Sequence, residues 1–95
     1  MNYVFEPEYE LESIDEHSRF MWKNKRLAAI LKSQVDENGT EVLEVDSHIR
    51  GIVEELEKAH IYIEQLNKRL KTSEEENAKM QKRLAALENI IAKQD

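Results

Sequence analysis

The fold is decided by residues 49–94, which read IRGIVEELEKAHIYIEQLNKRLKTSEEENAKMQKRLAALENIIAKQ. Counted from Ile49, apolar residues recur at alternating intervals of three and four, as at positions a and d of a heptad repeat. The a row consists of Ile49, Leu56, Ile63, Leu70, Asn77, Leu84 and Ile91, and the d row of Ile52, Ala59, Leu66, Ser73, Met80, Leu87 and Gln94. A repeat held over seven heptads is typical of a coiled coil. We therefore predict an all-α fold in which residues 47–95 form one long helix of a parallel coiled coil.

The apolar stripe needs a partner helix. The first 46 residues are too few to cover it along its whole length, so we expect the chain to assemble with copies of itself. The flanking charges favour parallel strands, because position g of one helix then meets position e of the next heptad on its neighbour. This arrangement would place Arg69 opposite Glu74, and likewise Glu55 opposite His60. The polar Asn77 at position a either fixes the register or is a tolerated soft spot.

The number of strands is open between two and three. The run Arg83-Leu84-Ala85-Ala86-Leu87-Glu88 resembles the R-h-x-x-h-E motif of short trimeric coiled coils. That resemblance implies that the Arg83 stem covers the seam while its head reaches Glu88 of a neighbour. Val53 and Ile90 also widen the apolar face, which favours more than two strands. Asn77 together with Leu at position d favours a dimer; we prefer the trimer.

The first 12 residues alternate between two kinds of side chain. Tyr3, Phe5, Tyr9 and Leu11 would point one way, whereas Glu6, Glu8, Glu10 and Glu12 would point the other. A period of two predicts an extended arm, which Pro7 confines to the edge of a sheet. Such an arm could bind another protein through its aromatic residues, fold back on its own oligomer, or order only when bound.

Residues 13–35 predict a short helix in a small head. Ser13 and Glu16 form a capping box, and an apolar stripe then follows at Phe20, Leu27, Ile30 and Leu31. This helix could dock outside the seam on Val53, His60 and Tyr62. Trp22 would then belong to the core of the head or form an exposed anchor for a partner.

For residues 36–46 we predict a turn at Asp36-Glu37-Asn38-Gly39 followed by a short linker. Asp46 or Ser47 would then cap the long helix. A β-hairpin over residues 27–45, centred on Asn38-Gly39, is the alternative.

Composition and motifs exclude several classes of protein. The chain has no Cys, and its three His residues lack the i, i+3 or i, i+4 partner of a helical metal site, so we expect no metal, no cofactor and no enzyme activity. The acidic Thr40–Asp46 segment separates the bases of residues 17–34 from the heptads, unlike a basic leucine zipper, so we do not expect nucleic-acid binding. We expect neither a membrane span nor a secretory signal, and a cytoplasmic or virion-associated location.

These features favour a structural or adaptor protein. The coiled coil would set the number of copies, and the N-terminal region would bind a larger assembly through Tyr3, Phe5, Tyr9, Leu11 and Trp22. In architecture, though in no motif, the chain is similar to small structural and scaffold proteins of bacteriophages. The alternative function is regulatory: the acidic N-terminal region would mask a basic surface of a host or viral nucleic-acid-processing protein.

Overall fold

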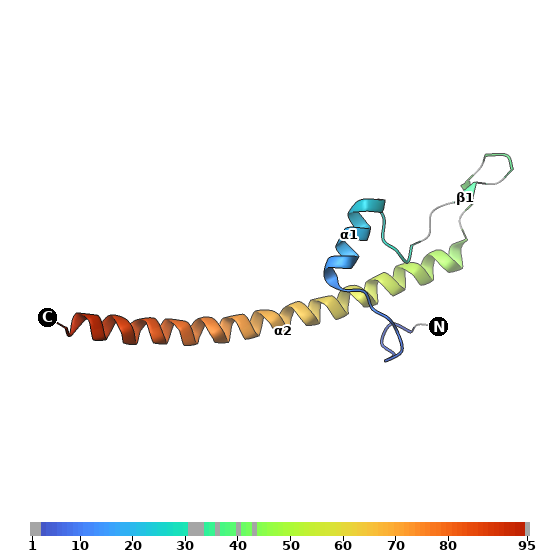
Figure 1. Ribbon diagram of the computed structural model, residues 1–95. Helices are drawn as coiled ribbons and strands as arrows, with labels where there is room; N and C mark the ends of the chain where they lie inside the picture. Colours follow the sequence, from blue (N-terminus) through green and yellow to red (C-terminus); the bar gives the residue numbers. More distant parts are fainter. Residues whose placement is uncertain (1–2, 31–33, 36, 40, 43, 95) are drawn as a thin grey trace. The chain divides into compact units, whose positions relative to one another are not determined.

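The computed structural model describes residues 3–30, 34, 35, 37–39, 41, 42 and 44–94. They form helix α1 (Ile14–Asn24), strands β1 (Gln34–Val35) and β2 (Glu41–Val42), and helix α2 (Val45–Ala92) (Figure 1). The chain divides into two units, Met1–Tyr62 and Ile63–Asp95, and each is described by itself. Apart from the two-residue strands, the fold is all-α with one long C-terminal helix, as predicted.

Helix α1 begins at the predicted cap. The backbone amide of Glu16 donates to the hydroxyl of Ser13 at 3.1 Å, which satisfies one of the free donors at the start of the helix. The helix ends at Asn24, well short of the predicted residue 35. Lys25 adopts a left-handed conformation (φ 55°, ψ 37°), and the Asn24 side chain donates to the carbonyl of Phe20 at 3.1 Å. The expected continuation of the helix through Leu27 and Ile30 is therefore wrong.

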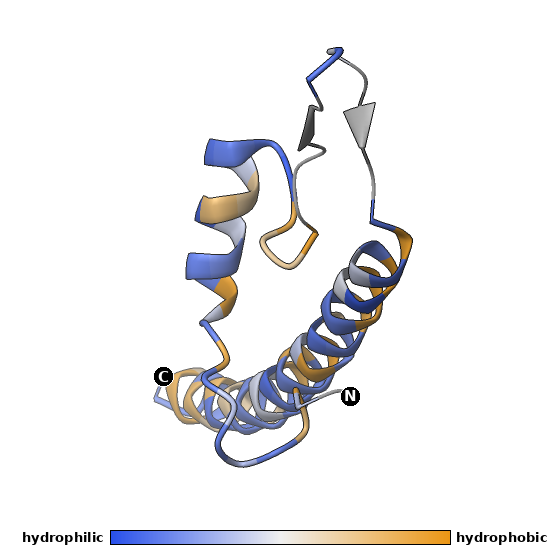
Figure 2. Ribbon diagram, turned by 90° about the vertical axis from the view of Figure 1, so that its right-hand side faces the viewer, coloured by the Kyte–Doolittle hydropathy of each residue, from blue (hydrophilic) through white to orange (hydrophobic). Residues whose placement is uncertain are grey.

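Residues 27–30 form a turn in which the amide of Ile30 donates to the carbonyl of Leu27. The Arg26 guanidinium holds this turn, because its Nη1 donates to the carbonyls of Leu27, Ala28 and Ile30. The turn is apolar and coloured orange in Figure 2. Leu31 of the predicted stripe lies outside the described residues.

A small β-hairpin follows. Its antiparallel strands pair Gln34 with Val42 and Val35 with Glu41. Gly39 in the connection has a φ of 81°, a region that glycine enters without steric cost. The alternative prediction of a hairpin around Asn38-Gly39 is thus confirmed, although the strands are much shorter than residues 27–45 would allow.

The N-terminal segment is not the predicted extended arm. The amide of Glu6 donates to the carbonyl of Tyr3, and that of Tyr9 to the carbonyl of Glu6, so residues 3–9 form two successive turns. Pro7 occupies the second position of the latter turn, where its fixed φ is favourable. The predicted alternation also fails, because Val4 is buried whereas Tyr3 and Phe5 are exposed.

Helix α2 begins at Val45, within two residues of the predicted cap. In the first unit its buried residues are Gly51, Glu55, Lys58 and Tyr62. In the second unit every described residue from 66 to 94 is exposed. Within the described part of the chain, neither helix has an apolar segment that could cross a membrane.

Candidate functional site

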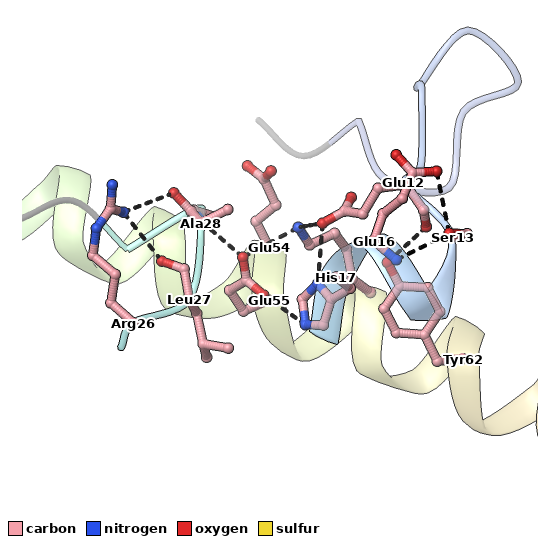
Figure 3. Close-up of polar contacts among 12 residues, drawn as sticks. Glu12, Ser13, Glu16, His17, Arg26, Leu27, Ala28, Glu54, Glu55 and Tyr62 are labelled. Carbon is pink, nitrogen blue, oxygen red and sulfur yellow. Dashed lines mark hydrogen bonds and ion pairs between the residues drawn. The ribbon is translucent and has the colours of Figure 1, made fainter. Parts of the chain in front are cut away.

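One side of α2 binds the N-terminal residues of the same unit. Gly51, Glu55, Lys58 and Tyr62 are spaced by four, three and four residues, so they share one side of the helix. They occupy heptad positions c and g, next to the predicted seam of positions a and d rather than on it. The N-terminal region therefore covers a polar side of α2. Figure 3 shows the side chains that meet there.

The turn of residues 27–30 contacts α2 at a glycine. A Cβ atom on Gly51 would lie 2.2 Å from the carbonyl oxygen of Ala29, so a larger residue would push the turn away. One helical turn further along α2, Oε2 of Glu55 accepts a hydrogen bond from the amide of Ala29 at 2.8 Å. Gly51 thus allows the close approach, and Glu55 fixes the turn by a charge-assisted hydrogen bond.

A cluster of charged side chains joins the segment before α1 to α2. The Lys58 ammonium lies 2.9 Å from Glu12 and 3.1 Å from Glu55. His17 of α1 lies between the same two carboxylates, with Nδ1 3.0 Å from Glu12 and Nε2 3.6 Å from Glu55. Lys58 is only 2% exposed and Glu55 only 6%. A carboxylate or ammonium so far from water is tolerated only when it is paired, and each of these has at least two partners.

Two tyrosines complete the contact. The hydroxyl of Tyr62 donates to the backbone carbonyl of Glu12 at 2.9 Å, and its ring lies 5.1 Å from that of His17. The hydroxyl of Tyr9 donates to Oε2 of Glu54 at 2.7 Å. These bonds fix the segment between the N-terminal turns and α1 at two points on α2.

The charge cluster shifts several pKa values. For Glu12, partial burial opposes ionisation, but hydrogen bonds from His17 and Lys58 outweigh it and lower the pKa from 4.5 to about 2. Burial likewise opposes the charge of Lys58, yet its hydrogen bonds with Glu12 and Glu55 raise its pKa. The pKa of Tyr62 is raised to about 12 by burial and by the nearby charges of Glu12 and Glu55. Glu12 is therefore held as a carboxylate beside the Lys58 cation.

The structure differs from the sequence prediction for one charge pair between copies and for part of one docking surface on α2. Glu55 is buried within its own chain, so it does not face solvent for the expected pairing with His60 of a neighbour. Tyr62 contacts α1, as expected, whereas Val53 and His60 stay exposed. No group of three or more His, Asp or Glu side chains in the described residues is arranged to hold a metal ion.

The predicted seam residues lie exposed in both units. In the first unit the large ones are Ile49, Ile52 and Leu56. In the second unit they are Ile63, Leu66, Leu70, Met80, Leu84, Leu87 and Ile91. All ten are between 44% and 69% exposed. Ala59, Asn77, Arg83 and Glu88 are exposed as well. Nothing in the described chain covers this row.

The predicted partner-binding residues divide into two groups. Tyr3, Phe5 and Trp22 are exposed, and Trp22 is therefore not the core of the head. Tyr9 and Leu11 are half-buried on their own chain. Trp22 lies under the amine of Lys25, at 4.9 Å, and beside a shallow hollow lined by Met21, Trp22, Lys25, Arg26 and Leu27.

Sequence reasoning missed the docking side of α2. Of the residues that form it, Glu55 was predicted to pair with His60 of a neighbouring copy, and Gly51 and Lys58 were given no role. A signal was present, because a glycine within a helix is unfavourable unless a close contact requires it. The spacing of Gly51, Glu55, Lys58 and Tyr62 repeats the three–four interval of the seam on a second face. Glu12 and His17, in contrast, carry no sequence signal that separates them from other charged residues near them.

Comparison of the chain with family models, with curated proteins and with solved structures found no match.

Proposed function

We propose that the protein is a non-enzymatic structural or adaptor protein that assembles with copies of itself through a parallel coiled coil of α2. The assembly presents several copies of the N-terminal unit to a larger structure. The observation that carries the proposal is the exposure of the a and d residues of α2, even where the N-terminal region docks on the helix.

The position of the docked region supports self-assembly. If the N-terminal region existed to cover the apolar side of its own helix, it would contact Ile49, Ile52 and Leu56. It binds Glu55 and Lys58 instead and leaves that row free. Burying a Leu or Ile side chain contributes roughly 1.5–3 kcal/mol, so several such residues per chain supply ample free energy for association. A second copy of α2 is the occupant whose pattern fits this row, since knobs at a and d pack into matching holes.

The second unit also favours a partner helix. Residues 66–94 are all exposed, and helices in proteins gain most of their stability from the packing of an amphipathic face. The heptad pattern of this segment would give it that packing. Three strands remain our preference over two, on the strength of Arg83 and Glu88, which are both exposed and free to pair between copies.

The N-terminal unit is the part that would bind other molecules, because Tyr3, Phe5 and Trp22 are exposed on it. The architectural similarity to phage structural and scaffold proteins makes a virus particle the leading candidate for the larger structure. The protein would then be found in the cytoplasm or in the virion.

The test is a matched pair of substitutions on α2. Ala59 and Ala78 are both exposed, but Ala59 occupies position d and Ala78 position b. We expect the unaltered chain to sediment as a dimer or trimer at micromolar concentration. Ala59→Asp should weaken assembly by about tenfold or more, because it introduces a charge into the seam, whereas Ala78→Asp should have little effect. A monomeric unaltered chain, or equal effects of the two substitutions, would refute the proposal.

A further inference from the structure

The C-terminal half of α1 carries an exposed basic surface, formed by Arg19, Trp22, Lys23 and Lys25. Trp22 is 64% exposed, and the three basic side chains around it are exposed too. The hollow beside Trp22 extends this surface over Met21 and Leu27. An exposed Trp framed by cations is typical of a binding surface, since Trp and Arg are enriched where proteins bind each other.

The backbone at Lys25 supports a binding role. Its left-handed conformation is one that glycine adopts freely and that an L-amino acid enters at a steric cost. Glycine would therefore end α1 more favourably at this position. The lysine instead places its ammonium 4.9 Å from the centre of the Trp22 ring. Lys25 therefore makes the end of α1 less stable than glycine would, but it adds a cation to the surface around Trp22.

The basic surface has no anionic partner among the residues that the structure describes. Residues 17–34 contain no acidic residue. Across residues 3–30 and the other described segments, Arg19, Lys23 and Lys25 form no ion pair. An anionic partner must therefore come from outside this part of the chain.

A complementary surface lies at the start of the same unit. Residues 3–10, which we call the acidic loop, expose Phe5 together with Glu6, Glu8 and Glu10. These three carboxylates form no ion pair with the described residues either. Two backbone hydrogen bonds and the burial of Val4 hold the loop in its turns, so little conformational entropy would be lost on binding.

We propose that the acidic loop of one copy binds the basic surface of a neighbouring copy. Each chain offers three exposed carboxylates beside an exposed Phe and three exposed cations beside an exposed Trp, and neither set forms an ion pair within the described residues. This proposal rests on the proposed parallel assembly, which brings identical N-terminal units to the same level of the coiled coil. Each copy then gives one loop and receives another, so the contacts close within a dimer or a trimer.

The first test uses two charge-reversed chains. The loop variant carries Glu6→Lys, Glu8→Lys and Glu10→Lys, and the helix variant carries Arg19→Glu, Lys23→Glu and Lys25→Glu. Each variant alone should assemble about tenfold more weakly than the unaltered chain, because like charges then face each other between copies. An equimolar mixture should form mixed oligomers in preference to either pure one, since both contacts of a mixed dimer, or two of the three contacts of a mixed trimer, become attractive again. Glu37→Lys, Glu64→Lys and Glu75→Lys, at three exposed positions outside the seam and its flanking e and g positions, form the control for altered net charge.

The second test separates binding from folding. Lys25→Gly should raise the melting temperature of the N-terminal unit, because it relieves the left-handed residue at the end of α1. The same change should weaken the contact between copies, because it removes the ammonium beside Trp22. If Lys25 had only a structural role, its replacement would not raise the melting temperature and weaken the contact between copies at the same time. Since Trp22 is the only tryptophan, its fluorescence emission reports the contact directly and should shift to shorter wavelength on assembly.

The outcomes distinguish this proposal from the proposed function. An unaltered chain that remains monomeric overturns both. An oligomer in which Trp22 emission stays that of a solvated indole, and in which the reversed chains mix at random, overturns only the contact between copies. In that case the acidic loop is free to bind a different macromolecule, as the regulatory alternative requires.

Discussion

Two sides of α2 within residues 45–62 show opposite relations between polarity and burial. On the side that receives the N-terminal region, Glu55 and Lys58 are 6% and 2% exposed. On the adjacent side, Ile49 and Leu56 are 52% and 56% exposed. Charged residues are buried where each has a partner in its own chain, and apolar residues remain in water where none exists. In the proposed assembly, the exposed apolar side is the one that a second copy would cover.

The two sides also differ in what they contribute. An apolar row gives a large but unspecific free energy, roughly proportional to the area buried. A buried ion cluster gives little net stability, because desolvation offsets much of the attraction. It does restrict the positions of its charged side chains, because each charge must stay close to an opposite one. We infer that the seam drives assembly whereas the cluster of Glu12, His17, Glu55 and Lys58 fixes where the N-terminal region sits.

The largest effect should follow from a charge in the seam. Leu56→Asp places a carboxylate at an a position and should weaken assembly by about 100-fold or more, since loss of a buried leucine alone costs about 2–5 kcal/mol. Sedimentation equilibrium measures this directly. Hydrogen exchange of residues 14–24 should stay slow, because Leu56 lies outside the docking side. Fast exchange of α1 in this variant would show that the two sides are not independent.

Loss of the buried cation should have the opposite pattern. Lys58→Met removes the lysine cation between the carboxylates of Glu12 and Glu55 and leaves His17 as the group they still share, at a cost of about 3–5 kcal/mol, and should undock α1 without dissolving the oligomer. Hydrogen exchange in α1 should therefore become fast while the sedimenting mass is unchanged. Lys68→Met, which breaks an exposed pair with Glu64, is the matched control and should change stability by less than about 1 kcal/mol. Adding Glu12→Gln and Glu55→Gln to Lys58→Met should restore part of the protection.

The long helix and its bounds could be predicted from the sequence because one periodic signal runs through it. The seven heptads outweigh any local ambiguity, and the start at Val45 agrees with the prediction to within two residues. The capping box at Ser13 and Glu16 was equally readable, since it depends on two residues three apart.

The N-terminal region could not be predicted so well, because tertiary contacts override its local patterns. Leu27, Ala28 and Ala29 prefer a helix, yet the turn they form gains a hydrogen bond to Glu55 and a close fit on Gly51. The alternation of residues 3–12 suggested a strand, but Pro7 and local hydrogen bonds made turns instead. The pairing of Glu12 with Lys58 spans 46 residues and leaves no periodic trace.

A methyl group at Gly51 should disturb the docking side alone. Gly51→Ala would place Cβ 2.2 Å from the Ala29 oxygen, so the turn must move away and lose its bond to Glu55. We expect a net cost of about 1–2 kcal/mol, although alanine favours the helix itself by roughly 1 kcal/mol. Thermal unfolding of the N-terminal unit measures it. Thr72→Ala, at an exposed position outside the seam, gains helix propensity without a contact at Ala29. If Thr72→Ala raises the stability while Gly51→Ala lowers it, the loss at Gly51 comes from the clash.

Acidification should release the N-terminal region by a smaller, graded effect. The pKa of Glu12 falls from 4.5 to about 2 in the folded unit, so its contribution to stability is complete above pH 4.5 and is lost as the pH falls towards 2. Allowing for the partial exposure of Glu12, we expect a loss of about 1–2 kcal/mol over this interval. At the alkaline end, the raised pKa values of Lys58 and of Tyr62, the latter about 12, mean that stability declines only above about pH 10. Nuclear Overhauser contacts between the rings of His17 and Tyr62, 5.1 Å apart, follow the docked state across this range.

The variant Glu12→Gln shows whether this acid transition belongs to Glu12. It removes the titrating group while keeping a side chain of the same length, so the docked unit should be less stable at pH 7 and should lose little more between pH 4.5 and 2. The seam, by contrast, has only Ile, Leu, Met, Ala, Ser, Asn and Gln at its a and d positions, none of which titrates. Assembly should therefore persist at a pH where the ring contact is already lost. An oligomer that dissociates in step with that contact would mean that the docked region, and not the apolar row, holds the copies together.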